Sequence, residues 1–314
     1  MTPHSHDSDF RHAALFYDGE AAYVDGLVPF IRGGVDAGEP ALVMVPGRKN
    51  DLLREALGAD ADAVHFADMA EVGANPARII PAWRDFVSDR AAPGRRVRGI
   101  GEPIWAERSP DELVECQHHE ELINVAFADG APMDLLCPYD ERVLGAAVVE
   151  EALRSHPVLL RDGNFVDCAR YEGVEAAAAP FGKPLPSAPI GAPELAFDLS
   201  SLDTVRGFVA VCAAEAGLGR DRRDDVVLAV NELASNSVRH GGGHGVLSAW
   251  SDDDHFIAEV RDRGQIDRPL AGREPRDASQ IGGHGLWLVN QLCDLMQMRT
   301  FPSGSVVRVL MRRD

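Results

Sequence analysis

The sequence is poor in cysteine, in aromatic residues and in positive charge. Its five cysteines among 314 residues form no C-x-x-C pair, and a polar, histidine-bearing segment stands where a signal peptide would have its apolar core. A reducing cytoplasm is therefore the expected compartment. No apolar run approaches the roughly 18 residues that a membrane helix needs. The net charge of -19, with no Lys/Arg run to offset it, disfavours direct binding to nucleic acid or to anionic membranes.

What the chain does have is enough apolar sequence for a substantial core, interrupted by one proline-rich stretch. It is 45% hydrophobic, and its length favours two domains over one. Residues 173–193 contain repeated Ala-Pro, Lys-Pro and Leu-Pro steps. Because each proline fixes its own φ and pushes its predecessor toward an extended conformation, this stretch is predicted to be a stiff, unpacked linker. The predicted domains are then residues 1–172 and 194–314.

The first region alternates short apolar strands with helical stretches. Strands are predicted at residues 13–17, 41–45, 64–66, 96–100 and 133–137, and helices at 21–33 and 51–57. This alternation, with continuously apolar strands, indicates an α/β fold with a mainly parallel sheet covered on both faces.

The turn Pro46-Gly47-Arg48-Lys49-Asn50 follows the second strand, where a nucleotide-binding α/β domain would carry a phosphate loop. Such a loop needs several glycines, so that backbone N–H groups converge on the phosphates, and a Lys followed by Ser or Thr. This turn has one glycine, and Asn50 follows its lysine. An ordinary strand-to-helix turn is the preferred interpretation, and a phosphate site is the alternative.

Several short motifs of the first region together resemble the MEDS, or DcmR-type, sensory domain. They are His12-Ala13-Ala14-Leu15-Phe16-Tyr17, Pro29-Phe30-Ile31, Gly38-Glu39-Pro40-Ala41-Leu42, Gly101-Glu102-Pro103-Ile104-Trp105, Leu136-Cys137-Pro138-Tyr139-Asp140 and His156-Pro157. The resemblance covers about residues 10–172. It implies a RecA/KaiC-like α/β fold that lacks the P-loop, and a role in signal input, with a small organic ligand among the signals it could receive.

Five residues of these motifs are candidates for a sensory pocket: His12, Glu102, Trp105, Cys137 and Tyr139. All but His12 lie at ends of predicted strands, where α/β proteins open their ligand crevices. A Trp or Cys at such a position is also a common part of the core, and that alternative stays open.

The sequence His118-His119-Glu120 has three interpretations: a metal-ligand pair, a phospho-acceptor histidine, or a solvated helix face. Adjacent histidines on a helix point about 100° apart, so they cannot readily share one ion. A phospho-acceptor helix would lie in a helical hairpin feeding directly into an ATP domain, whereas strand-like segments and the proline-rich stretch intervene here. The solvated face is therefore preferred.

The second region places helices before an antiparallel sheet. A strand at 195–199 precedes two helices, of which the second spans about 221–239, and the remaining elements are strands at 245–251, 255–261, 296–301 and 305–311 and a helix at 286–295. This order predicts an α/β sandwich with an antiparallel-rich sheet. Residues 263–281 are polar and rich in turn-forming residues, and are expected to form a mobile, functional loop.

Four motifs of the second region resemble the GHKL (Bergerat) ATPase fold and, within it, the RsbW-type anti-sigma-factor serine kinases. They are the segment from Glu232 to Gly241, which matches the N box, then Asp262-Arg263-Gly264, Gly283-His284-Gly285-Leu286 and Gly304-Ser305-Val306-Val307-Arg308. The resemblance covers nearly all of residues 194–314. It implies that this domain binds ATP and Mg²⁺.

The residue types suit the implied nucleotide site. Asn236 offers a neutral oxygen that can complete the shell of Mg²⁺, and Asp262 can accept the adenine amino hydrogen. Gly264 allows a tight turn beside the base. Backbone N–H groups at a helix start favour phosphate, and the resemblance places there or nearby Gly283, His284, Gly285, Leu286 and Ser305.

Glu232 is the candidate catalytic residue. It stands four residues before Asn236, so both side chains share one helix face. A carboxylate there would position or deprotonate the attacking hydroxyl, because in phosphoryl transfer a protein mainly orients groups and neutralises charge. An isolated Glu and Asn would read as a surface residue and a helix cap; the downstream motifs favour the ATP site.

Three histidines in this region have open or weak interpretations. His284 could contact phosphate or face solvent. His240 and His244 have the spacing of zinc ligands, but the glycines between them indicate a loop, and a zinc site is disfavoured.

Gln265 and Ile266 follow Gly264 where the wider family often has a second glycine, so the rim of the base pocket is expected to differ.

The resemblance implies a mechanism and partners. The domain would transfer the γ-phosphoryl group of ATP to a serine of an anti-anti-sigma (STAS-type) protein and sequester a sigma factor when that antagonist is absent, under control of the first domain. Related kinase domains pair as homodimers. The alternatives are a partner-sequestering module that binds ATP without transferring phosphate, and a two-component histidine kinase, which needs an acceptor histidine in its own chain.

Overall fold

The computed structural model describes residues 10–90, 92, 95–175, 183–274 and 284–313. The chain divides into two compact units, Met1–Ala177 and Ala178–Asp314. Each unit has its own sheet, and each is described by itself.

The first unit is built on a seven-stranded sheet with the order β3-β2-β4-β5-β1-β6-β7. The strands are β1 (Phe10–Tyr17), β2 (Ala41–Val45), β3 (Val64–Asp68), β4 (Val97–Gly101), β5 (Met133–Asp140), β6 (Val158–Arg161) and β7 (Asn164–Asp167). All neighbouring strands are parallel except β6 and β7. The predicted α/β class with a mainly parallel sheet is confirmed.

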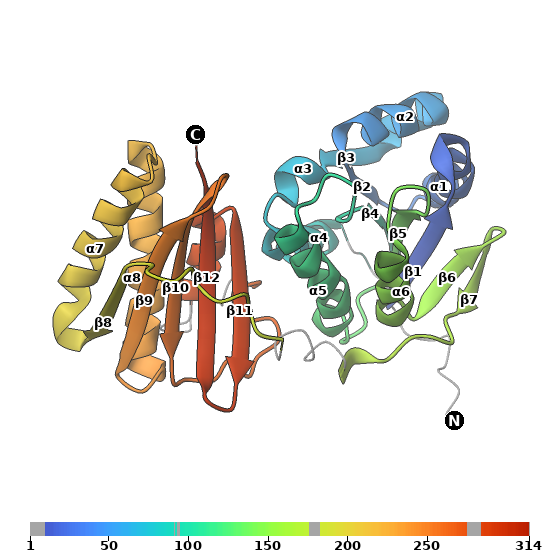
Figure 1. Cartoon of the computed structure of the whole chain (residues 1–314). Coiled ribbons are helices and arrows are strands. Elements are labelled where there is room, and N and C mark those ends of the chain that lie inside the picture. Colours follow the sequence, from blue (N-terminus) through green and yellow to red (C-terminus); the bar gives the residue numbers. More distant parts are fainter. Residues whose placement is uncertain (1–9, 91, 93–94, 176–182, 275–283, 314) are drawn as a thin grey trace. The chain divides into compact units, whose positions relative to one another are not determined.

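Helices cover both faces of this sheet (Figure 1). They are α1 (Gly19–Asp36), α2 (Gly47–Leu57), α3 (Met69–Val72), α4 (Ile79–Arg90), α5 (Pro110–Ala126) and α6 (Ala146–Ser155). Crossovers between parallel strands are right-handed, so the two that run from β1 toward β3 place α1 and α2 on one face. The crossovers that run back toward β6 place α4, α5 and α6 on the other.

Strand β1 contributes to both layers because successive side chains of a strand point to opposite faces. Ala13, Leu15 and Tyr17 join the apolar core beneath α1. His12 points the other way and contacts α5. The carboxyl ends of β1, β2, β4 and β5 lie at one edge of the sheet, where a parallel α/β fold forms its ligand crevice.

The hairpin β6–β7 was not predicted from the sequence. Its turn is Asp162-Gly163, and both residues have positive φ, 48° and 74°. Asp-Gly is the dipeptide that such a turn favours, so this hairpin had a readable signal.

The second unit has a five-stranded, entirely antiparallel sheet with the order β11-β12-β10-β9-β8. Its elements are β8 (Glu194–Asp198), α7 (Leu202–Glu215), α8 (Arg220–His240), β9 (His244–Ser251), β10 (His255–Asp262), α9 (Gly285–Leu292), β11 (Leu295–Phe301) and β12 (Gly304–Arg312). Helices α7 and α8 lie against one face of the sheet (Figure 1). Val226, Val230 and Leu233 of α8 are buried in this layer. The predicted sandwich is confirmed, although α9 ends three residues earlier than expected.

Part of the proline-rich stretch packs on the second unit. Arg308 Nη2 donates to the carbonyl oxygen of Pro186 at 2.6 Å, and the backbone N–H of Ala249 donates to the carbonyl of Pro193 at 3.1 Å. Arg308 also pairs with Glu259, which is fully buried. The guanidinium N–H groups of Arg308 that do not contact Glu259 need another acceptor. The expectation of an unpacked linker is therefore wrong for these residues.

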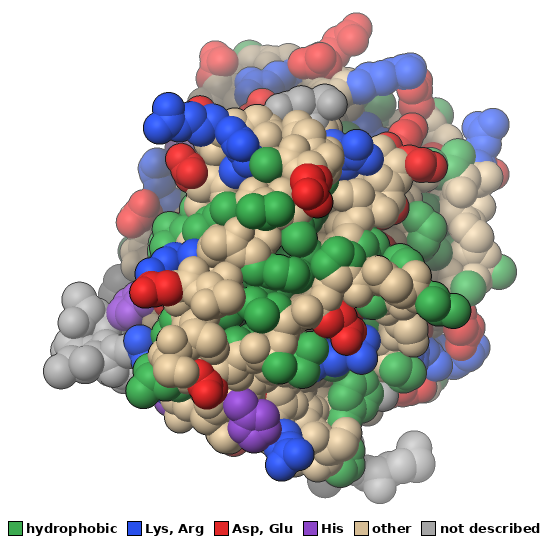
Figure 2. Space-filling model, turned by 60° about the vertical axis from the view of Figure 1, so that its left-hand side comes forward, with side chains coloured by type: hydrophobic (Ala, Val, Ile, Leu, Met, Phe, Trp, Pro, Cys, Tyr) green, Lys and Arg blue, Asp and Glu red, His purple; other side chains and the backbone are tan. Residues whose placement is uncertain are grey.

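The surface of the second unit carries several exposed apolar side chains. Leu199, Val211 and Leu228 are 72%, 58% and 43% exposed. Figure 2, turned so that the α7 side comes forward, shows hydrophobic side chains mixed with acidic and basic ones. Scattered apolar residues of this kind are normal for a protein surface.

Candidate functional site

Helix α8 brings the predicted carboxylate and carboxamide together. Glu232 and Asn236 are one turn apart, and both approach Gly285 at the first position of α9. A Cβ atom at Gly285 would lie 2.9 Å from Asn236 Nδ2 and 3.1 Å from Glu232 Oε2. The absence of a side chain at Gly285 thus lets both groups reach the start of α9.

Asp262 ends β10 on the other side of this space and is held by three donors. Its Oδ1 accepts from the Gly264 N–H at 2.8 Å and the Ser305 hydroxyl at 2.9 Å, and its Oδ2 accepts from the Ser237 hydroxyl at 2.5 Å. A carboxylate has about four accepting positions, so these bonds fix its orientation and leave one position for a ligand.

Glycines around Asp262 permit a close approach of the backbone. Gly304 has φ of +141°, and a Cβ there would lie 1.9 Å from the carbonyl oxygen of Asp262. A Cβ at Gly241 would lie 2.4 Å from Asp262 Cγ, and one at Gly264 would lie 2.9 Å from the Cα of Gly241. Only glycine fits these positions without displacing the backbone around Asp262 or, at position 241, its carboxylate.

These groups line a cavity of about 400 Å³ in the second unit. Among the residues predicted from the sequence, its wall includes Asn236, Asp262, Gly264, Gly285, Leu286 and Ser305. Glu232 reaches its edge beside Gly285, His284 is exposed, and Gly283 lies outside the described residues. The volume is within the usual range for small-molecule sites.

Sequence reasoning missed Ser237 and the packing role of Gly241. Both belong to the quoted N-box segment, but only the contact with Asp262, which lies more than 20 residues further along the chain, reveals their role. The predicted loop at 263–281 is described only to residue 274; there Asn290 Nδ2 donates to the Gly272 carbonyl at 2.8 Å, and the rest lies outside the described residues.

Another cavity, of about 490 Å³, lies in the first unit at the carboxyl ends of its strands. Glu102 and Trp105 line it together with Tyr17, Tyr23 and Lys49. Lys49 forms an ion pair with Glu102 and a 2.6 Å hydrogen bond with the Tyr17 hydroxyl, which in turn donates to Glu102 at 3.2 Å. Burial raises the pKa of Glu102 to about 7, even though Lys49 and Tyr17 lower it.

Comparison with known proteins assigns both units. Residues 11–157 match the family model of the MEthanogen/methylotroph, DcmR Sensory domain (MEDS), and residues 195–311 match that of the histidine kinase-like ATPase domain. The chain joins a MEDS domain to a histidine kinase-like ATPase domain. No curated protein matches it. No helix among the described residues is long and apolar enough to cross a membrane.

Two solved structures show limited similarity. The RsbU and RsbW domains of Rv1364c from Mycobacterium tuberculosis are 23% identical over 38% of this chain and 32% of that one, with a TM-score of 0.29. The histidine kinase AdeS of Acinetobacter baumannii is 14% identical over 40% of this chain and 70% of that one, with a TM-score of 0.24. The chain thus spans about a third of the first of these structures.

The MEDS domain separates the five predicted pocket residues into two places. Glu102 and Trp105 line the cavity. His12, Cys137 and Tyr139 are at most 2% exposed and lie beneath α5 and α6 instead. Burial, reinforced by the nearby His156, lowers the pKa of His12 to about 4.

The expectation of a solvated face at His118-His119-Glu120 is wrong. These residues are 1%, 2% and 1% exposed. Helix α5 lies in the layer between α4 and α6, so its polar residues are covered from several sides (Figure 1). Helical periodicity in the sequence gives no sign of this, because the buried face of α5 is itself polar.

The turn after β2 is filled by its own side chains. Asn50 Nδ2 donates to the carbonyls of Val45 and Ala67, both at 2.9 Å, and the charge of Lys49 is matched by Glu102. A Cβ at Gly47 would lie 2.9 Å from the carboxylate of Asp68. This environment favours the ordinary turn over a phosphate loop.

Proposed function

We propose that this protein is a cytoplasmic, ATP-dependent regulator of the anti-sigma-factor type. Its ATPase domain would bind ATP with Mg²⁺ and phosphorylate a serine of a STAS-type anti-anti-sigma protein, which would control the availability of a sigma factor. The MEDS domain would supply the input. The observation that carries the proposal is the convergence of Glu232 and Asn236 on Gly285, with Asp262 fixed on the far side of the same cavity.

The Asp262 end of the cavity suits adenine. Three donors leave the carboxylate one free accepting position, which matches the single amino group of that base. The apolar side chains of Val260, Leu233 and Val307 also line the cavity and can contact the faces of the ring. A nucleobase without an exocyclic amino group in that position would leave the remaining accepting position of Asp262 unfilled, and that costs affinity.

The Gly285 end suits phosphate and Mg²⁺. Helix α9 begins there, so its first N–H groups point toward the space beside Asn236. Bound ATP·Mg²⁺ would supply the phosphoryl group and neutralise its charge. Asn236 would provide an oxygen of the type Mg²⁺ prefers, and the backbone N–H groups of α9 would orient the phosphates.

Glu232 supports phosphoryl transfer over simple nucleotide binding. Asn236, Asp262 and the glycines suffice to hold a nucleotide, whereas the carboxylate of Glu232 near phosphate would repel it. The position of Glu232 beside Gly285 is consistent with orienting or deprotonating an acceptor hydroxyl.

The two-component alternative lacks a suitable acceptor among the described residues. His118 and His119 are buried in α5, and α5 is followed by β5, α6, β6 and β7 before the ATPase domain begins at β8. An accessible acceptor helix that feeds directly into the ATPase domain is not present in the described part of the chain. This arrangement favours an acceptor in another polypeptide.

Labelled ATP separates the candidate functions. The full-length protein is incubated with γ-labelled ATP, Mg²⁺ and candidate STAS-type proteins, and the products are treated with acid and with alkali. Acid-stable label on a partner supports the proposal. Acid-labile label on the protein itself would indicate a histidine kinase, and bound nucleotide without any transfer would indicate a sequestering module.

A further inference from the structure

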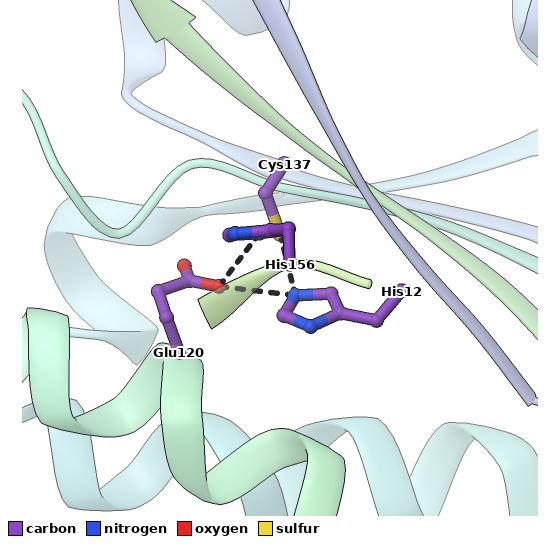
Figure 3. A group of neighbouring side chains, drawn as sticks. All are labelled: His12, Glu120, Cys137 and His156. Atoms are coloured by element: carbon purple, nitrogen blue, oxygen red, sulfur yellow. Dashed lines mark hydrogen bonds and ion pairs between the residues drawn. The ribbon is translucent and has the colours of Figure 1, made fainter. Parts of the chain in front are cut away.

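Four buried side chains of the MEDS domain converge from four different elements (Figure 3). His12 comes from β1, Glu120 from α5, Cys137 from β5 and His156 from the residue that follows α6. His12 pairs with Leu135 in the parallel register of β1 and β5, so Cys137, two residues further on, points to the same face of the sheet. None of the four is more than 2% exposed.

The potential ligand atoms lie at distances typical of a metal shell. Glu120 Oε2 is 3.1 Å from His12 Nε2 and 3.3 Å from His156 Nε2, and Cys137 Sγ is 3.4 Å from His12 Nε2. All four ligand atoms lie within 4.8 Å of one another. Nitrogen and oxygen ligands at 2.0–2.2 Å from a tetrahedral ion are about 3.3–3.6 Å apart.

Hydrogen bonds outside the cluster place a proton on Nδ1 of both imidazoles, so that in the neutral rings Nε2 carries a lone pair that faces the cluster. His156 Nδ1 is 2.8 Å from the Ala152 carbonyl, which can only accept, so Nδ1 carries the proton. Asn124 Nδ2 donates to the Ser155 carbonyl at 2.7 Å, which turns Asn124 Oδ1 toward His12 Nδ1 at 3.0 Å. Such outer hydrogen bonds are the usual supports of metal-binding histidines.

The cluster therefore has too many acceptors. With both imidazoles neutral, two Nε2 lone pairs and a carboxylate face one another, and of the four side chains only the Cys137 thiol can donate. Glu120 Oε1 and His156 Nε2 have no hydrogen-bond partner. Burying unpaired acceptors and a carboxylate charge is costly, and a cation at the centre would remove that cost.

We propose that His12, Glu120, Cys137 and His156 form a closed four-ligand site for a divalent transition-metal ion, with Zn²⁺ as the best match. Two imidazole nitrogens, one thiolate and one carboxylate are all established zinc ligands. The Cys137 proton leaves to solvent when the sulfur coordinates. One thiolate and one carboxylate then balance the charge of the ion, so the buried centre is neutral.

The four protein ligands leave no open position on a tetrahedral ion, so the site holds the fold together and does not expose the metal to a substrate. The ion joins β1 and β5 of the sheet to α5 and to the end of α6. Metal occupancy is thereby linked to the stability of the MEDS domain.

The test uses full-length protein purified without a metal-affinity step, in a His4→Ala/His6→Ala background that removes the histidines near the N-terminus. The metal-free protein is titrated with Zn²⁺ against a chromophoric chelator, and separately with Co²⁺. The expected result is one tightly bound equivalent, a sulfur-to-cobalt charge-transfer band and the intense visible bands of tetrahedral cobalt. Absence of tight binding, or a cobalt spectrum without the sulfur band, would overturn the proposal.

Variants assign the ligands. Cys137→Ser should abolish the charge-transfer band, and Glu120→Gln should keep the band but lower Zn²⁺ affinity by at least about tenfold. Asn124→Ala, which removes only the support of His12, should lower affinity by about 10–100-fold. Cys168→Ser is the matched control, because Cys168 is also buried but its thiol donates to the Leu153 carbonyl. An unchanged affinity in Cys137→Ser would refute the assignment.

A measurement on the unmutated cysteines covers the case in which a variant does not fold. One equivalent of Zn²⁺ should slow alkylation of Cys137 in mild denaturant, as mapped by mass spectrometry, and leave the rate at Cys212 unchanged because Cys212 lies in the ATPase domain. Equal rates at Cys137 with and without Zn²⁺ would contradict the site.

Discussion

The two domains have cavities of similar size but different internal chemistry. In the MEDS domain, about 490 Å³ of space borders an internal ion pair, because Lys49 and the Tyr17 hydroxyl both donate to Glu102 Oε1, while Glu102 Oε2 and the Tyr23 hydroxyl have no hydrogen-bond partner among the described residues. In the ATPase domain, about 400 Å³ is bordered by a helix start and by a carboxylate with one free accepting position. The second cavity is preorganised for a ligand, whereas a polar ligand of the first has to compete with an internal ion pair.

The largest expected effect separates binding from transfer in the ATPase cavity. Glu232→Gln should lower phosphoryl transfer by about 10²–10⁴-fold, because it removes the carboxylate that activates the hydroxyl, while nucleotide affinity is retained. Asn236→Ala should instead weaken Mg²⁺-dependent nucleotide binding itself. Calorimetry and transfer assays measure the two quantities. Glu215→Gln and Asn231→Ala are the controls on α7 and α8, and identical profiles for Glu232→Gln and Asn236→Ala would show that the two residues have no separate roles.

The next effect tests whether glycine is required around Asp262. Gly304→Ala should destabilise the ATPase domain by about 4 kcal/mol, because the new Cβ would overlap the Asp262 carbonyl at a φ of +141°. Gly207→Ala on α7 is the control: nothing lies within 4 Å of its Cβ position, and replacing a helical glycine should stabilise by about 0.5–1 kcal/mol. Calorimetric unfolding measures both. Similar destabilisation by the two substitutions would contradict the steric argument.

The two domains also differ in how much of each site could be predicted from the sequence. The ATPase site is assembled from short local motifs, so Asp262 and Gly264, or Glu232 and Asn236, could be recognised by their spacing. Strand periodicity also gave most of both sheets.

The polar cluster of the MEDS domain could not be predicted in that way. Its members are residues 12, 120, 137 and 156, and only the register of β1 with β5 and the packing of α5 bring them together. Likewise, nothing local indicates that His118 and His119 are buried, because burial depends on which helices lie on either side of α5. Strand-end position suggested that Glu102 and Cys137 share a pocket, but they point to different places in the domain.

A smaller effect tests the buried carboxyl of Glu102 in the MEDS cavity through the pH dependence of stability. The pKa of Glu102 in the folded protein, about 7, is above the ordinary value of 4.5, so between these two pH values the folded state holds a proton that the unfolded state has lost. The corresponding stabilisation is fully present below pH 4.5 and is lost as the pH rises through about 7. Its size is about 3 kcal/mol.

Glu102→Gln should remove this pH dependence from the unfolding free energy of the MEDS domain. Glu20→Gln, at the exposed rim of the same cavity, should leave it in place. The measurement is denaturant unfolding of the full-length protein between pH 4.5 and 8. A slope that persists in Glu102→Gln would place its origin elsewhere in the domain.

The smallest expected effect concerns the turn after β2. In the MEDS domain this turn is filled by its own side chains, whereas the start of α9 in the ATPase domain is the proposed phosphate site. Asn50→Ala leaves the Val45 and Ala67 carbonyls without their donor, which should destabilise the MEDS domain by about 2 kcal/mol. Asn164→Ala, an exposed residue of the β6–β7 hairpin, should change stability by only a few tenths of a kcal/mol. The carboxylates of Asp68 and Glu102 lie beside this turn and disfavour phosphate there. The chain is therefore expected to bind one nucleotide, and neither substitution should alter that stoichiometry. A second equivalent that disappears in Asn50→Ala would mean that this turn binds phosphate after all.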